Sequence, residues 1–117
     1  MEALLCAFQN SRAGLRHAVG TERAVRQEFM VLLVAVPLAF VLGTDMWRRA
    51  LLIGAVFMVL AVELLNTCIE KLCDHVTPEI HPTIKVVKDM GSAAVLFALM
   101  GAALLWLVAL FERLAWL

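Results

Sequence analysis

Long apolar stretches separated by short polar segments dominate the chain. One apolar run extends from Phe29 to Leu42, a second occupies most of residues 50–69, and a third reaches from Met90 to Phe111. A helix needs about 20 mostly apolar residues to cross the hydrocarbon core of a bilayer. The pattern therefore predicts three membrane-spanning helices, over residues 25–43, 48–72 and 84–112.

A polar segment, residues 74–84, separates the second and third predicted spans. It contains Pro78 and Pro82 together with several charged and hydroxyl side chains. Proline is favoured in the first turn of a helix, where its missing N–H costs nothing. We expect a loop in this segment, with the third helix beginning near Pro82 or Thr83.

The first 24 residues follow a different pattern. Apolar residues recur at spacings of three, four and seven from Leu4 to Val19, and Arg12 and Arg16 lie between them. This spacing is typical of an amphipathic helix that lies at a membrane surface. The expected fold is an all-α membrane protein in which residues 1–117 form a single unit, with a surface helix over residues 1–24.

Composition supports a membrane location and argues against one class of partner. Hydrophobic residues make up 63% of the 117 residues, well above the roughly 45–50% of a soluble domain, and the mean hydropathy is +0.91. Ten basic residues balance ten acidic ones. A neutral chain without a basic face argues against nucleic-acid binding.

Basic residues are distributed unevenly about the predicted spans, and this predicts an orientation. The N-terminal segment carries four arginines and the 71–88 region three lysines, whereas three arginines, at positions 48, 49 and 113, lie at the opposite ends of the spans. Cytoplasmic segments are enriched in Lys and Arg. We expect the N-terminus and the polar connection to be cytoplasmic and the C-terminus to lie outside.

Four polar residues interrupt the end of the second apolar stretch. Glu63, Asn66, Glu70 and Asp74 have offsets of 0, 3, 7 and 11, which return to one face of a helix. We call this set the polar stripe. A carboxylate within a membrane span is costly and usually functional, so Glu63 is the first candidate for chemistry.

Phosphoryl transfer fits the residues expected near the cytoplasmic boundary. That reaction needs carboxylates that hold a divalent metal, a cation on the phosphates and a group that orients the attacking hydroxyl. Glu22 and Glu70 are candidate Mg²⁺ ligands, Lys88 a candidate phosphate contact and Glu63 a candidate base. From the residues alone, a proton-coupled transporter or a purely structural stripe stays open.

Two motifs resemble a known family, the bacterial membrane-integral diacylglycerol kinases. The motifs are Glu63-Leu-Leu-Asn66-Thr-Cys-Ile-Glu70 with Asp74, and Lys88-Asp89-Met90-Gly91-Ser92-Ala93-Ala94-Val95. The resemblance continues upstream through Gly14-Leu15-Arg16 and Arg26-Gln27-Glu28, so it covers essentially the whole chain.

The resemblance implies an activity and an assembly. The family transfers the γ-phosphate of MgATP to diacylglycerol and forms phosphatidic acid. It works as a homotrimer in the bacterial inner membrane, with sites shared between subunits. Gram-positive relatives phosphorylate undecaprenol, which is the alternative acceptor.

The resemblance also implies roles for individual residues. Glu63 would be the catalytic base, and Glu22 and Glu70 would bind the metal. The nucleotide would be contacted by Glu22, Glu70, Glu79, His81, Lys88 and Asp89. The lipid would be contacted by Glu63, Asn66, Ser92, Trp106, Arg16 and Glu28, with Arg26 nearby. Ala3 and Asn10 depart from the family form, which has an arginine and an aromatic residue at these positions.

Overall fold

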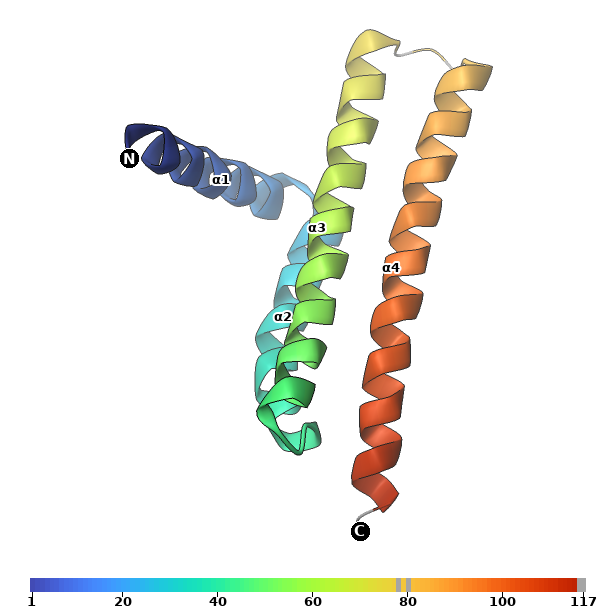
Figure 1. The fold of residues 1–117 in the computed structure, drawn as a ribbon. Coiled ribbons are helices and arrows are strands. Elements are labelled where there is room, and N and C mark those ends of the chain that lie inside the picture. The colour runs from blue at the N-terminus through green and yellow to red at the C-terminus, as the bar shows by residue number, and fades with distance from the viewer. Residues whose placement is uncertain (78, 80, 116–117) are drawn as a thin grey trace.

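The computed structural model describes residues 1–77, 79 and 81–115, and every regular element in this part of the chain is a helix (Figure 1). The helices are α1 (Glu2–Thr21), α2 (Arg23–Leu42), α3 (Met46–Val76) and α4 (Pro82–Ala115). Three of them, α2, α3 and α4, are long and apolar enough to cross a membrane. The prediction of an all-helical protein is confirmed, and the three apolar helices are candidate membrane spans.

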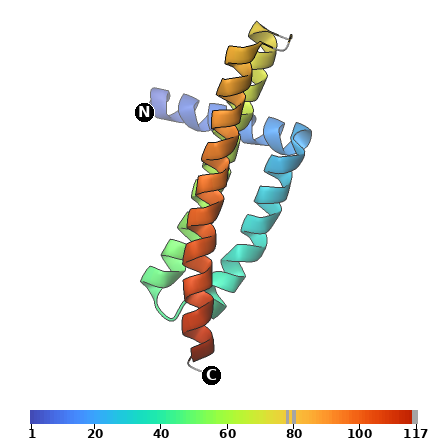
Figure 2. The same ribbon diagram turned by 90° about the vertical axis from the view of Figure 1, so that its right-hand side faces the viewer.

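The three long helices form a bundle, and α1 lies crosswise to it. Figure 1 shows α2 and α4 running beside α3, with α1 extending away from the bundle so that the N-terminus is distant from it. Figure 2, seen from the side of α4, shows α1 passing across the bundle near the end where α3 and α4 are connected. The polar end of α3 therefore extends past the level of α1.

The corner between α1 and α2 is set by packing on both sides of Glu22. Glu22 is extended, and its N–H donates to the carbonyl of Ala18. Ala18 and the fully buried Val25 belong to one apolar cluster with Val56 and Leu60 of α3. The chain turns at Glu22 and not after residue 24, because Ala18 and Val25 both face this cluster.

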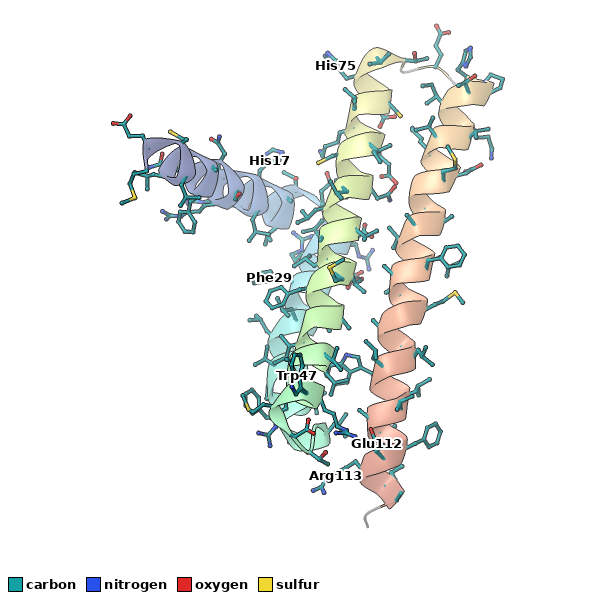
Figure 3. The ribbon with its side chains drawn as sticks, in the orientation of Figure 1. His17, Phe29, Trp47, His75, Glu112 and Arg113 are labelled. Atoms are coloured by element: carbon teal, nitrogen blue, oxygen red, sulfur yellow. The ribbon has the colours of Figure 1, made fainter. Side chains whose placement is uncertain are left out.

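A network of charged side chains holds the opposite end of the bundle together. Asp45 caps α3 by accepting the N–H of Arg48 at 2.8 Å, and its other oxygen pairs with the Arg48 guanidinium at 2.7 Å. The same guanidinium reaches Glu112 of α4 at 3.1 Å. Figure 3 shows Trp47 and Glu112 at this end and His75 at the other. Arg48 thus ties the α2–α3 turn to α4.

Two contacts fix α4 along the length of α3. The indole N–H of Trp106 donates to the backbone carbonyl of Leu52 at 3.1 Å. Nearer the polar end, Gly91 is buried, and a Cβ at this position would clash with the Asn66 side-chain oxygen. The absence of a side chain at Gly91 lets the Asn66 amide lie against the α4 backbone.

The connection between α3 and α4 is shorter than the sequence predicts. Helix α3 continues to Val76 and so replaces the first part of the loop expected over residues 74–84, whereas α4 begins at Pro82, as the sequence predicts. Thr77, which precedes a proline and is therefore disfavoured in a helix, is extended and closes α3 by donating its N–H to Cys73. The whole polar stripe is consequently helical.

The contact at Gly91 predicts opposite effects for two glycine substitutions on α4. Gly91→Ala should lower the free energy of unfolding by about 1 kcal/mol, since the clash with Asn66 outweighs the gain in helix propensity. Among the described residues, a Cβ on Gly101 would meet no neighbour within 4 Å, so Gly101→Ala is the matched control and should be neutral or stabilising. Thermal unfolding in detergent measures both, and equal stability of the two variants would contradict the proposed packing.

The Asp45 cap predicts a pH-dependent contribution to stability. The backbone N–H of Arg48 lowers the pKa of Asp45, and the Arg48 charge adds to this effect. A carboxyl whose pKa is lower in the folded protein stabilises it above the unfolded pKa, and this contribution is lost as the pH falls through the folded pKa. Asp45→Asn, which keeps a capping oxygen, should therefore lower the melting temperature at pH 7, and this effect should begin to shrink as the pH falls below about 4. A difference that persists unchanged at pH 3 would rule out the charge as its cause.

Candidate functional site

The polar stripe runs along one face of α3 and becomes more exposed toward the end of the helix. Glu63 is partly buried and Asn66 is buried, whereas Glu70 and Asp74 are exposed. Helical spacing places Val59 and Val56 on the same face, one and two turns before Glu63 respectively. One α3 face therefore changes from apolar to anionic at Glu63.

Two further carboxylates lie near Glu63. Glu28 of α2 and Glu70, two turns along α3, are close enough for their charges to act on Glu63. The Asn66 side chain lies between the two stripe carboxylates and donates to Glu70 at 3.1 Å. Its own oxygen is buried and has no hydrogen-bond partner among the residues that the structure describes. Two carboxylates, one from α2 and one from α3, thus lie near the predicted base.

Helix α4 brings cations to the exposed half of the stripe. The Lys88 ammonium lies 2.6 Å from an Asp74 oxygen, and the charge of Glu70 also acts on it. Asp89 does not join this group, because its carboxylate pairs with Lys85 at 2.8 Å one turn earlier on the same helix. Lys88 is therefore the α4 cation that pairs with the stripe.

Glu22 reaches the site through an ion pair with α3. Its carboxylate oxygen lies 2.7 Å from the ammonium of Lys71. Because Lys71 follows Glu70 directly in the sequence, this pair brings the two predicted metal ligands, Glu22 and Glu70, to the same level of α3. The corner between α1 and α2 is what places Glu22 there.

The carboxylates present fit a magnesium site that is completed by a substrate. Among the described residues, no three His, Cys, Asp or Glu side chains are grouped so that they could hold a metal by themselves. Mg²⁺ is commonly held by one or two carboxylates plus the phosphates of a substrate. Glu22 and Glu70 are the two carboxylates that the sequence predicts for this role.

An apolar groove of about 530 Å³ leads away from the carboxylates. Its walls come from α2 and α4 and its floor from Val56 and Val59 of α3, with Glu28 at one end and Trp106 on the α4 side. The remaining lining residues are Met30, Val31, Val34, Ala35, Leu38, Leu99, Ala102 and Ala103. Because Val56 and Val59 share a face with Glu63, this groove and the polar stripe are continuous along α3.

Other predicted site residues lie apart from this cluster. Arg16 is exposed on α1, where it lines a separate shallow hollow beside Arg12 and His17. Ser92 and Glu79 are exposed, and the described part of the chain contains no hydrogen bond or ion pair that joins either to the stripe. His81 accepts the N–H of Thr83 at 3.2 Å and so caps α4. Arg26 donates to the carbonyl of Val19 and braces the α1–α2 corner.

The structure adds two residues that the sequence did not single out. Lys71 pairs with a predicted metal ligand, although the sequence identified it only as one of the basic residues that set the orientation. Gly91 makes room for Asn66, although the sequence identified it only as part of the motif that begins at Lys88. The sequence did contain one signal for Lys71, which is its position directly after Glu70, a predicted metal ligand.

Comparison with known proteins identifies the family. The model of the family described as prokaryotic diacylglycerol kinase matches residues 9–110. The diacylglycerol kinase of Escherichia coli (strain K12) is 44% identical over 100 residues, which cover 86% of this chain and 82% of that protein. The diacylglycerol kinase of Pseudomonas aeruginosa is 41% identical over 106 residues, covering 91% and 86%. That of Helicobacter pylori (strain ATCC 700392 / 26695) is 40% identical over 103 residues, covering 88% and 80%. The chain therefore belongs to the prokaryotic diacylglycerol kinase family, and it is a lipid kinase whose three apolar helices are candidate membrane spans.

Proposed function

We propose that this protein transfers the γ-phosphoryl group of ATP to the free hydroxyl of diacylglycerol and forms phosphatidic acid. The observation that carries the proposal is the position of Glu63, partly buried on the α3 face where the apolar groove gives way to carboxylates. A lipid whose acyl chains lie in the groove would present its hydroxyl at this level. Binding a lipid hydroxyl beside Glu63 in this way does not require the sequence motifs of soluble kinases.

The lipid half of the site would use the groove and its polar end. Glu28 and Trp106 line the groove, and Asn66 lies one turn beyond Glu63. We assign lipid contacts to these residues, to Glu63 itself, and to Ser92 and Arg16 at the headgroup level. An undecaprenol acceptor would use the same apolar surface, so the acceptor assignment depends on a direct comparison of the two lipids.

The reaction needs one proton acceptor beside the lipid hydroxyl. As the hydroxyl oxygen bonds to the γ-phosphorus, the bond from that phosphorus to the bridging oxygen breaks and ADP leaves. The hydroxyl proton passes to the Glu63 carboxylate. General-base assistance of this kind typically contributes a factor of about 10² to 10⁴ in rate, and the surrounding apolar residues would keep water from competing with the lipid.

The donor half of the site would lie at the exposed end of the stripe. Lys88 would contact the phosphates, and Asp89, Glu79 and His81 would contact the rest of the nucleotide. Glu22 and Glu70 would hold Mg²⁺, which when bound would neutralise charge on the phosphates. The order along α3, with Glu63 before Glu70, would place the acceptor nearer the membrane centre than the donor.

We further propose that α1 is an amphipathic helix on the cytoplasmic surface of the bacterial inner membrane and that residues 1–117 act as one unit within a homotrimer. Only 6% of the apolar window of α4 is buried, compared with 39% for α3, so α4 offers a large face to lipid or to another subunit. A site shared between subunits would give ATP and the lipid more enclosure than three helices provide.

A proton-coupled transporter is the alternative from another functional class. It would also use Glu63, but it needs polar access from both sides of the membrane. The polar stripe and the charged residues that pair with it lie at one end of α3, whereas the groove beyond Glu63 is lined by apolar residues apart from Glu28. This distribution favours chemistry at one membrane surface.

One prediction of the proposed function concerns Glu63 as the catalytic base. Glu63→Gln should reduce kcat for diacylglycerol phosphorylation by about 10² to 10⁴, measured in mixed micelles with MgATP. Glu112→Gln changes a carboxylate in the same way at the other end of the bundle, and it should keep activity within a few-fold of the wild type. Each variant is compared by circular dichroism and gel filtration to establish that it folds.

The same assay separates the alternatives. Phosphorylation of undecaprenol at a higher kcat/KM than diacylglycerol would overturn the acceptor assignment. Glu63→Gln activity close to that of the wild type would overturn the base assignment. A pH-driven flux without ATP consumption would point to the transporter.

Another prediction concerns the apolar groove as the site of the acyl chains. Ala103→Phe should raise the KM for diacylglycerol several-fold and leave the KM for MgATP unchanged, because a phenyl ring would fill part of the acyl-chain space. Ala50→Phe makes the same change at an exposed position of α3 that does not line the groove. If both variants changed the KM for the lipid equally, the groove would not be the acyl-chain site.

A further inference from the structure

The cluster around the stripe contains two ion pairs that cross between elements. Glu22, at the corner of α1 and α2, pairs with Lys71 of α3 at 2.7 Å, and Lys88 of α4 pairs with Asp74 of α3 at 2.6 Å. Lys71 and Asp74 are three residues apart on α3, and the charge of Asp74 already acts on Lys71. Each pair therefore combines one residue assigned to the substrate with one residue that has no assigned role.

Both pairs are exposed enough to exchange partners. The side chains of Lys71 and Glu22 are 52% and 30% exposed, and those of Lys88 and Asp74 are 38% and 65% exposed. Exposed ion pairs of this kind contribute little to stability, because water solvates the separated charges almost as well. A divalent cation at Glu22, or a phosphate at Lys88, would therefore displace the internal partner at small cost.

Displacement of both partners at once would leave Lys71 and Asp74 free to pair with each other. Residues three apart on a helix are neighbours, and opposite charges at this spacing attract. The exchange conserves charge pairing: the metal takes Glu22, the phosphates take Lys88, and the two released side chains neutralise each other. A ligand that brings only a metal or only a phosphate would leave one released charge without its new partner.

We propose that Lys71 and Asp74 form an internal counter-ion exchange that couples metal binding to nucleotide binding. Before substrate binds, Lys71 holds Glu22 and Asp74 holds Lys88. MgATP binds with favourable cooperativity because it alone releases both residues together. Lys71 and Asp74 are positioning residues, and the inference rests on the proposed function for the roles of Glu22 and Lys88 and for the identity of the nucleotide.

Metal binding without turnover tests this inference. The probe is Mn²⁺, whose free concentration is followed by electron paramagnetic resonance with the full-length protein in detergent, with and without a non-hydrolysable ATP analogue. In the wild type, the analogue should strengthen Mn²⁺ binding. In Lys71→Met, Mn²⁺ alone should bind about threefold to tenfold more tightly, because the competing cation at Glu22 is gone, and the strengthening by the analogue should shrink.

A matched variant controls for net charge. Lys85→Met removes the same charge from the same end of the bundle, but Lys85 pairs with Asp89 and not with Glu22. It should leave the affinity for Mn²⁺ alone unchanged. An unchanged affinity in Lys71→Met, or an equal gain in both variants, would overturn the exchange.

The two proposals fail in different ways. A wild-type protein that does not phosphorylate diacylglycerol would overturn the proposed function, while the Lys71→Met measurement with Mn²⁺ alone would remain decisive for the counter-ion at Glu22. A normal kinase with no change of metal affinity in Lys71→Met would overturn the exchange alone. Thermal unfolding of each variant establishes that a changed affinity does not come from a changed fold.

Discussion

The neutralisation of polar groups on an otherwise apolar helix is the constraint on which this structure depends. Hydrocarbon offers no hydrogen-bond partners, so polar side chains at membrane depth must find them in the protein or in water. On α3 the partners of the polar side chains change along the helix. Asn66 donates to Glu70 and is packed against Gly91, whereas the exposed Asp74 pairs with Lys88 of α4. The helices are therefore joined through the same groups that supply the candidate chemistry.

The two ends of the bundle use charged residues in different ways. At one end, the Arg48 guanidinium makes hydrogen bonds to both Asp45 and Glu112 with its planar fork, and such pairs are directional. At the other end, Lys71 and Lys88 are point charges on flexible chains, each held by one carboxylate. The bundle is thus anchored at the Arg48 end and adaptable at the end where substrates would bind.

The α3 face joins two environments that a lipid kinase needs side by side. Val56 and Val59 form the floor of the apolar groove, and Glu63 follows on the same face with Glu28 and Glu70 nearby. An amphiphile lying along this face would place its apolar part against the groove and its reacting hydroxyl beside Glu63. Carboxylates that lie close together repel one another, and the lysines beside Glu22 and Asp74 offset part of that repulsion.

The sequence by itself determined the helices, the three candidate spans and the stripe, because hydrophobic length and helical periodicity are local properties of the chain. It did not determine the end of α3, where helix replaced an expected loop, or the turn at Glu22, where Ala18 and Val25 pack on α3. The Glu22–Lys71 pair, the groove and the contact of Gly91 with Asn66 were decided only by the tertiary structure. Each joins residues that lie on different elements, and the distances between these residues depend on how the helices pack and not on the order of residues within any one helix.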